Sequence, residues 1–225
     1  MPLESGELDA VASSPALMDL SSPVTALIAS FRISGYKMAI GCQDGLVKFL
    51  RCPLDGSPSL ASSISLDGPI SSVLFLRIKP NVTDLLVTSA CGYACYFAGI
   101  ATKLLVSPVV IVPPEQDSLT SAVACDVDFD GEKEVLLGSY SQEVYCYKLQ
   151  SGEFQLLWTL RLEHPVMGIA TLDFNLDGVL EVCVLTMYGV CVYHPSFALA
   201  LQKLRRVKKF LSDSEVHSTY SPTLH

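Results

Sequence analysis

The stretch Val123-Ala-Cys-Asp-Val-Asp-Phe-Asp-Gly-Glu-Lys-Glu-Val-Leu-Leu-Gly138 returns later in the chain as Ile169-Ala-Thr-Leu-Asp-Phe-Asn-Leu-Asp-Gly-Val-Leu-Glu-Val-Cys-Val184. Each matched polar position is displaced by 47 residues. The pairs are Asp126 with Asp173, Asp128 with Asn175, Asp130 with Asp177, Gly131 with Gly178 and Glu134 with Glu181. A fixed period of this length is the signature of a repeat architecture.

The segment that follows the acidic stretch is also repeated. It begins at intervals of 47, 50 and 47 residues, so four units are visible, although the first two lack the acidic residues. Three of the copies begin with glycine, which predicts a turn with positive φ there, and Gln142 is the exception. The four copies are Gly45-Leu-Val-Lys-Phe49, Gly92-Tyr-Ala-Cys-Tyr96, Gln142-Glu-Val-Tyr-Cys146 and Gly189-Val-Cys-Val-Tyr193.

Within each unit the apolar runs are short and rich in β-branched and aromatic residues. In the third unit they predict strands over 122–127, 134–139, 143–148 and 154–160. Four short strands in a unit of about 47–50 residues are typical of propeller blades. We therefore predict an all-β chain that forms a partial β-propeller with four visible blades, without the Trp-Asp and Gly-His signatures of WD repeats.

The boundaries of the repeat divide the chain into four parts. Residues 1–22 are predicted to be a flexible lead-in, 23–194 the four blades, and 212–225 a flexible tail. Between them, residues 195–211 combine apolar side chains at helical spacing with five basic residues, which predicts a basic amphipathic helix. One interpretation places this helix on the last blade with its charges solvated. The other makes it a contact for an acidic partner or an anionic membrane surface.

The composition limits the classes of protein and partner that fit this chain. Half of the 225 residues are hydrophobic, which favours a folded core, and the net charge of −8 disfavours nucleic acid as a partner. The eight cysteines show no metal-ligand spacing and are interpreted as buried thiols in a reducing compartment. The first thirty residues resemble no export signal. Leu85 to Thr102 carries no charge, but its glycines and the repeat argue against a transmembrane span.

The two acidic stretches are candidate cation loops. Alternating oxygen ligands followed by glycine form a calcium-type pattern, here Asp126, Asp128, Asp130 and Glu134 in the third unit and Asp173, Asn175, Asp177 and Glu181 in the fourth. The flanking segments are strand-like, so the loops resemble those of the integrin-α (FG-GAP) propeller repeats and not EF-hands. Asp and Asn also order turns without metal, by bonding backbone N–H groups. We favour the metal-free turn, and calcium remains the alternative cofactor.

Several segments resemble the kaptin family in order and spacing. They are Ala39-Ile-Gly-Cys-Gln-Asp-Gly45, Asp67-Gly-Pro-Ile-Ser-Ser-Val73, Cys125-Asp-Val-Asp-Phe-Asp-Gly-Glu-Lys-Glu-Val135, Gln142-Glu-Val-Tyr-Cys-Tyr-Lys148 and Leu156-Leu-Trp158. The resemblance covers most of this chain but only the C-terminal half of the family's usual length. It implies a subunit of the KICSTOR scaffold on the lysosome surface, which recruits the GATOR complex and restrains TOR signalling when nutrients are short. It also implies an association with actin.

No catalytic constellation is recognisable in the sequence. Nucleophile elbows, phosphate loops and zinc-binding histidine pairs are missing from it. His164 and His194 lie beside prolines at the ends of predicted strands and are interpreted as turn residues. We therefore expect a non-catalytic scaffold in the cytoplasm and on the lysosomal membrane surface. The alternatives are an actin-filament-associated protein, a secreted calcium-dependent propeller and an enzyme.

Overall fold

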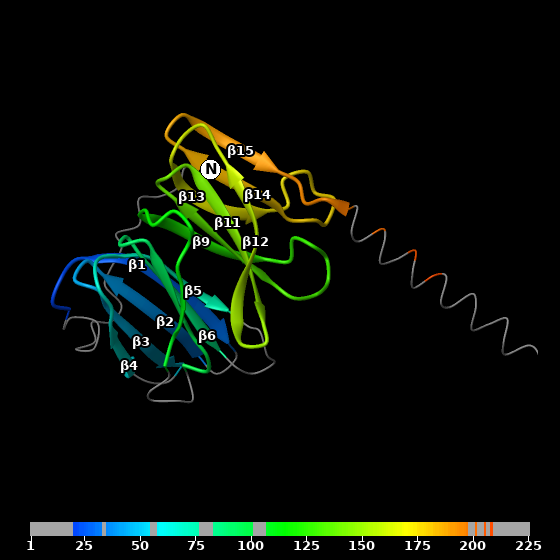
Figure 1. Cartoon of the computed structure of the whole chain (residues 1–225). Coiled ribbons are helices and arrows are strands. Elements are labelled where there is room, and N and C mark those ends of the chain that lie inside the picture. The colour runs from blue at the N-terminus through cyan, green and yellow to red at the C-terminus, as the bar shows by residue number, and fades with distance from the viewer. Residues whose placement is uncertain are drawn as a thin grey trace, which may run out of the picture.

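The computed structural model describes residues 20–32, 35–54, 58–76, 83–100 and 107–197, and the single residues 201, 205 and 208. Strands that are adjacent in sequence pair as antiparallel neighbours in four separate sheets (Figure 1). The first sheet contains β1 (Val24–Arg32), β2 (Gly35–Cys42), β3 (Leu46–Pro53) and β4 (Ser59–Ser65), and the second contains β5 (Ile70–Leu76), β6 (Asp84–Ser89), β7 (Tyr93–Phe97) and β8 (Val109–Ile111). The third contains β9 (Leu119–Cys125), β10 (Glu134–Ser139), β11 (Glu143–Gln150) and β12 (Glu153–Arg161), and the fourth contains β13 (Val166–Leu172), β14 (Glu181–Thr186) and β15 (Gly189–Tyr193).

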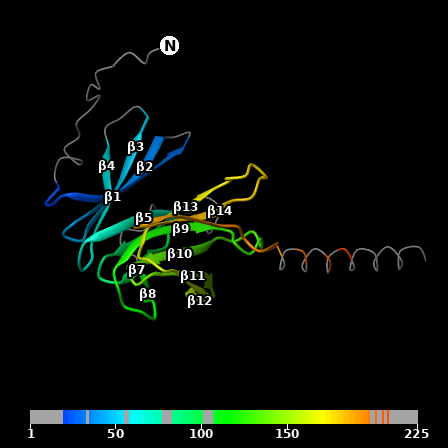
Figure 2. The ribbon, with the colours of Figure 1, turned by 90° about the horizontal axis from the view of Figure 1, so that it is seen from above.

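The first strands of the sheets lie next to one another. β1 contacts β5, β5 contacts β9, and β9 contacts β13, so the sheets radiate from a shared inner side (Figure 2). This arrangement confirms the predicted all-β chain with four antiparallel sheets. The predicted strands of the third unit are also confirmed, with shifts of at most three residues at their ends. In the fourth sheet, the described residues form three strands.

Each pair of neighbouring sheets shares a hydrophobic core. Phe49, from the first sheet, packs with Ile70 and Leu85 of the second. Tyr96, from the second, packs with Leu137 and Tyr145 of the third, and a further cluster joins the third sheet to the fourth. The second strands of the two middle sheets are buried on both faces, as their apolar runs predict: all six residues of β6 and of β10 are buried. In β14, whose apolar run predicts the same, one face is uncovered and Leu185 is exposed.

Close approach between sheets depends on two glycines. A Cβ atom added at Gly41 would lie 2.4 Å from Cγ2 of Ile70, and one added at Gly138 would lie 2.6 Å from Cγ1 of Val166. Ile70 and Val166 begin the innermost strand of the following sheet. Because glycine has no Cβ atom, the next sheet can pack against β2 and β10 at these points.

The hairpin turns differ in length, which corrects one prediction. Three residues separate β2 from β3, β6 from β7, and β10 from β11, and the third of these has positive φ: Gly45 (86°), Gly92 (87°) and Gln142 (70°). Two residues separate β14 from β15, and Gly189 is the first residue of β15. The prediction that Gly189 occupies the same turn position is wrong, because the shorter turn advances β15 by one residue.

The first and fourth sheets each present an apolar face away from the other sheets. On the first sheet Leu27 and Phe31 are 60% and 61% exposed, and the ring of Phe31 lies 5.1 Å from that of Tyr36. On the fourth sheet Leu172 and Leu185 are 56% and 48% exposed. We call these the first and the last end face. Figure 1 shows the two sheets at opposite sides of the assembly.

The predictions for the cysteines, the uncharged stretch and the two ends of the chain can be compared with the structure only in part. Five cysteines are buried as expected, whereas Cys183 and Cys191 are half-buried and Cys91 is exposed. Leu85 and its apolar successors form β6 and β7, and in the described part of the chain no helix is long and apolar enough to cross a membrane. The predicted helix over 195–211 lies outside the described residues, except for 195–197 and the single positions 201, 205 and 208. The lead-in before residue 20 and the tail over 212–225 also lie outside them.

Candidate cation sites in the two acidic loops

The predicted acidic residues lie in two equivalent loops. In the third sheet, the loop between β9 and β10 carries the three aspartates, and Glu134 begins β10. In the fourth sheet, the loop between β13 and β14 carries Asp173, Asn175 and Asp177, and Glu181 begins β14. The β9–β10 and β13–β14 pairings match, since Glu134 pairs with Cys125 and Glu181 pairs with Leu172.

Backbone N–H groups order the third-unit loop. The two carboxylate oxygens of Asp126 accept hydrogen bonds from the N–H groups of Asp130 (3.1 Å) and Gly131 (2.8 Å). Oε2 of Glu134 accepts the N–H of Val127 at 2.9 Å. Phe129 has a positive φ of 57°, a conformation that few side chains adopt without such support. These are the turn-forming bonds that Asp and Asn make without metal.

An ammonium group lies among the remaining oxygens of this loop. Nζ of Lys148, near the end of β11, is 2.7 Å from Oε1 of Glu134 and within 3.2 Å of carboxylate oxygens of Asp128 and Asp130. Burial by itself lowers the pKa of Lys148, but the hydrogen bonds to Asp130, Glu134 and Asp128 outweigh it, so the pKa lies above its ordinary value. The lysine therefore supplies the positive charge that this cluster of carboxylates requires.

The fourth-unit loop repeats the backbone pattern closely. Asp173 accepts the N–H groups of Asp177 (3.0 Å) and Gly178 (2.9 Å), and Oε2 of Glu181 accepts the N–H of Phe174 at 2.7 Å. Leu176 has a φ of 60°, as Phe129 does in the third unit. Oδ1 of Asp177 accepts the N–H of Val179, and this bond is the main cause that lowers the pKa of Asp177. The two loops therefore share one backbone design.

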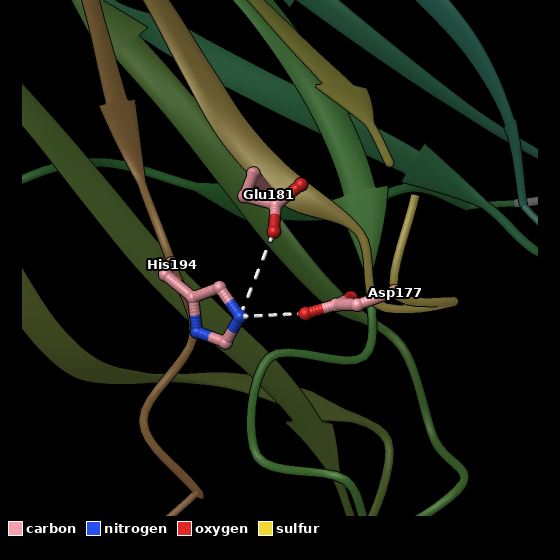
Figure 3. Close-up of side chains that lie close together, drawn as sticks. All are labelled: Asp177, Glu181 and His194. Carbon is pink, nitrogen blue, oxygen red and sulfur yellow. Dashed lines mark ion pairs between the residues drawn. The ribbon is translucent and has the colours of Figure 1, made fainter. Parts of the chain in front are cut away.

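The group facing the carboxylates differs in the fourth unit. Val135 pairs with Tyr147, whereas Val182 pairs with Tyr193, so His194 occupies the place that Lys148 has in the third sheet. Nε2 of His194 lies 3.6 Å from Oδ2 of Asp177 and 3.6 Å from Oε1 of Glu181 (Figure 3). The interpretation of His194 as a turn residue alone missed this contact. The signal was present in the hairpin, whose two-residue turn shifts the offset between the units from 47 to 46.

The carboxylates and imidazole gather in two groups that could each hold a metal ion. One atom each of Asp126, Asp128 and Asp130 lie within 4.8 Å of one another, and the same holds for Asp177, Glu181 and His194. Beside them, a cavity of about 580 Å³ opens between the third and fourth sheets. Its lining is mainly apolar and includes Trp158, Leu160 and Val184. His194 and Asp128 contribute polar groups to the same lining.

Four consecutive antiparallel sheets whose first strands lie side by side define a protein of the β-propeller class. Solved structures agree: Sqt1 of Saccharomyces cerevisiae superposes with a TM-score of 0.61 at 16% identity, over 77% of this chain and 48% of that one. The Pan2 WD40 domain of Neurospora crassa gives 0.55 at 12%, over 81% and 49%, and BBS1N, solved in complex with ARL6DN, gives 0.58 at 14%, over 76% and 51%. At these identities the likeness establishes the fold alone.

Sequence comparison identifies the family. The family described as "KICSTOR complex protein kaptin" matches residues 7–205. The mouse (Mus musculus) KICSTOR complex protein kaptin is 30% identical over 188 residues, which cover 74% of this chain and 44% of the relative. The chain therefore belongs to the kaptin family. It spans less than half the length of this relative and about half of each matched propeller.

Proposed function

We propose that this chain is a non-catalytic scaffold subunit of a KICSTOR-type complex. In this role it helps to recruit the GATOR complex to lysosomes and restrains TOR signalling when amino acids or glucose are scarce. It is cytoplasmic and reaches the lysosomal membrane surface through its protein partners. Membership of a family described as a complex subunit supports the proposal.

The observation that carries the proposal is the pair of end faces. A large contiguous apolar patch on an isolated chain usually marks a site where another protein binds. On the last end face, Leu172, Leu185 and the β15 residues Val190 and Val192 are all exposed, and the strand pairings place them on one side of the sheet. Four sheets also correspond to about half of each matched propeller. The end faces are therefore the surfaces on which we expect the protein partners to pack.

Affinity purification from nutrient-starved cells tests this function. We expect the tagged chain to recover the KICSTOR and GATOR subunits. Leu27→Asp with Phe31→Asp on the first end face, or Leu172→Asp with Leu185→Asp on the last, should abolish recovery. Val112→Asp is a matched control, because Val112 is exposed but lies after β8, outside both end faces. Recovery of chaperones alone, or equal recovery by all variants, would contradict the proposal.

Actin association is the alternative function. Its candidate surfaces are the propeller and the basic segment over 195–211. The basic segment falls mostly outside the described residues, and no contact within the described ranges favours actin on the propeller. Co-sedimentation with actin filaments separates the two functions. A scaffold without actin affinity stays in the supernatant, whereas saturable pelleting that competes with binding of the complex would favour the cytoskeletal role.

A further inference from the structure

We propose that Asp177, Glu181 and His194 form a binding site for a divalent transition-metal ion of the zinc class. This site differs from a calcium-type loop, since an imidazole nitrogen from the residue that follows β15 takes the place of loop oxygens. It is also independent of the scaffold function. Three side chains converge on one point, one from the β13–β14 loop, one from the start of β14 and one from the residue after β15, as Figure 3 shows.

The first argument is a buried oxygen without a hydrogen bond. The side chain of Glu181 is 4% exposed, and its Oε1 has no hydrogen-bond donor, whereas Oε2 accepts the N–H of Phe174. The equivalent oxygen of Glu134 accepts a hydrogen bond from the ammonium group of Lys148 at 2.7 Å. A buried carboxylate oxygen without a donor or a cation is costly. Glu181 therefore requires a positive partner at the point that it faces.

The second argument is the orientation of the imidazole. Nδ1 of His194 lies 2.8 Å from the carbonyl oxygen of Pro195, which can only accept a hydrogen bond, so this nitrogen carries the proton. In the neutral ring, Nε2 then presents its lone pair to the carboxylates of Asp177 and Glu181. A histidine that binds metal characteristically donates its other N–H to a carbonyl or carboxylate in this way. Three electron-pair donors facing one point define a cation site.

The third argument is the spacing of these donors. For ligands about 2.0–2.2 Å from a tetrahedral zinc ion, the distance between two ligand atoms is roughly 3.3–3.6 Å. Nε2 of His194 is 3.6 Å from each carboxylate oxygen. Two carboxylates and one imidazole match zinc chemistry with one open position, whereas calcium requires six to eight oxygens. The ion would tie the start of β14 to the end of β15.

Metal titration of the metal-stripped full-length chain tests the site. We expect zinc to bind one site and to raise the melting temperature, and His194→Gln or Glu181→Gln to weaken that site more than about tenfold. His164→Gln is the control, since His164 belongs to the same sheet's surroundings but contacts Tyr188, in the turn at the opposite end of the β14–β15 hairpin from the carboxylates. Cobalt(II) reports the ligands: a nitrogen–oxygen site gives d–d bands without the thiolate charge-transfer band that cysteine ligation would add.

His194→Lys separates metal binding from folding. An ammonium there should satisfy Glu181 as Lys148 satisfies Glu134, so this variant should fold, keep its melting temperature without metal and lose the zinc response. The proposal is overturned if wild type binds no zinc, if His194→Lys and Glu181→Gln bind it as wild type does, or if the cobalt spectrum shows thiolate ligation. Loss of the zinc response in a folded His194→Lys variant supports it.

Discussion

Lys148 and His194 occupy equivalent positions in the third and fourth sheets, each facing the glutamate that begins the second strand of its sheet. One is a permanent cation at neutral pH and the other is an imidazole that must gain a proton or a metal ion to serve as one. The two acidic loops therefore share their backbone but differ in how their negative charge is balanced.

Removing the ammonium should destabilise the third blade. Lys148→Met leaves Glu134, which is fully buried, facing Asp128 and Asp130 with no counter-charge. Breaking a buried ion pair on one side costs about 3 kcal/mol. We expect the free energy of unfolding to fall by about that amount in urea titrations at pH 7. Lys133→Met, at an exposed position in the same loop, is the control, and an equal loss in both variants would contradict the assignment.

Calcium should distinguish the same variant from wild type. In wild type, the ammonium lies between the carboxylates that a calcium ion would need. In Lys148→Met those oxygens become available, and carbonyl and carboxylate oxygens are the ligands that calcium prefers. We expect millimolar calcium to raise the melting temperature of Lys148→Met more than that of wild type. A larger response in wild type would mean that calcium binds elsewhere.

Gln142→Gly should stabilise the protein. Gln142 has a φ of 70° at the turn position where the first two units have Gly45 and Gly92. A side chain other than glycine costs about 1 kcal/mol in the left-handed region. The backbone bond from the N–H of Leu162 to the carbonyl of Gln142 does not depend on the side chain and is retained. Chemical denaturation should show a gain of up to about 1 kcal/mol. Gly45→Ala, the converse change, should lower stability, since its Cβ would meet the carbonyl of Leu66.

Gly138→Ala tests the packing of the third sheet against the fourth. The added methyl group would meet Val166 at 2.6 Å, inside van der Waals contact. Overpacking of this kind costs about 1–3 kcal/mol. The melting temperature should fall, whereas Gly189→Ala, with open space around the position, should have little effect. Val166→Ala in the Gly138→Ala background should recover part of the loss, and no recovery would mean that the clash lies elsewhere.

Stability should decline at alkaline pH. Burial raises the pKa of Tyr145 and of Tyr147 to about 12, and the ion pairs described above raise that of Lys148. A folded-state pKa above the unfolded value contributes stability that is complete below the unfolded pKa and is lost as the pH rises toward the folded one. Burial also raises the pKa of the Cys125 and Cys146 thiols to about 12, from an unfolded value of about 8.5. The unfolding midpoint in urea should therefore be steady up to about pH 8 and fall from about pH 8.5 upward, first through the thiols and then through the tyrosines and the lysine. A midpoint that rises over this range would contradict the burial of these groups.

The repeat predicted the strands well because each unit carries its own hydrophobic pattern and turn residues. The 47-residue offset correctly related the acidic loops, since both connect equivalent first and second strands. It failed at β15, where the turn at Met187 and Tyr188 is one residue shorter than its counterpart. The partners of the carboxylates, Lys148 and His194, depend on cross-strand register, which the hydrophobic pattern alone does not determine. The apolar end faces also required the sheets to be placed in space.

The contact at Gly138 has a consequence for how such chains can be rearranged. Leu185, 47 residues later, is the corresponding side chain of the fourth sheet, and it is exposed on the last end face. Transplanting the fourth unit into the place of the third would bring a leucine against Val166, where there is space for little more than a hydrogen atom. The second sheet carries a buried threonine, Thr88, at the equivalent position, so each sheet is fitted to its own successor. The units are therefore not interchangeable cassettes, and a shuffled version would have to refit this position to whichever sheet follows.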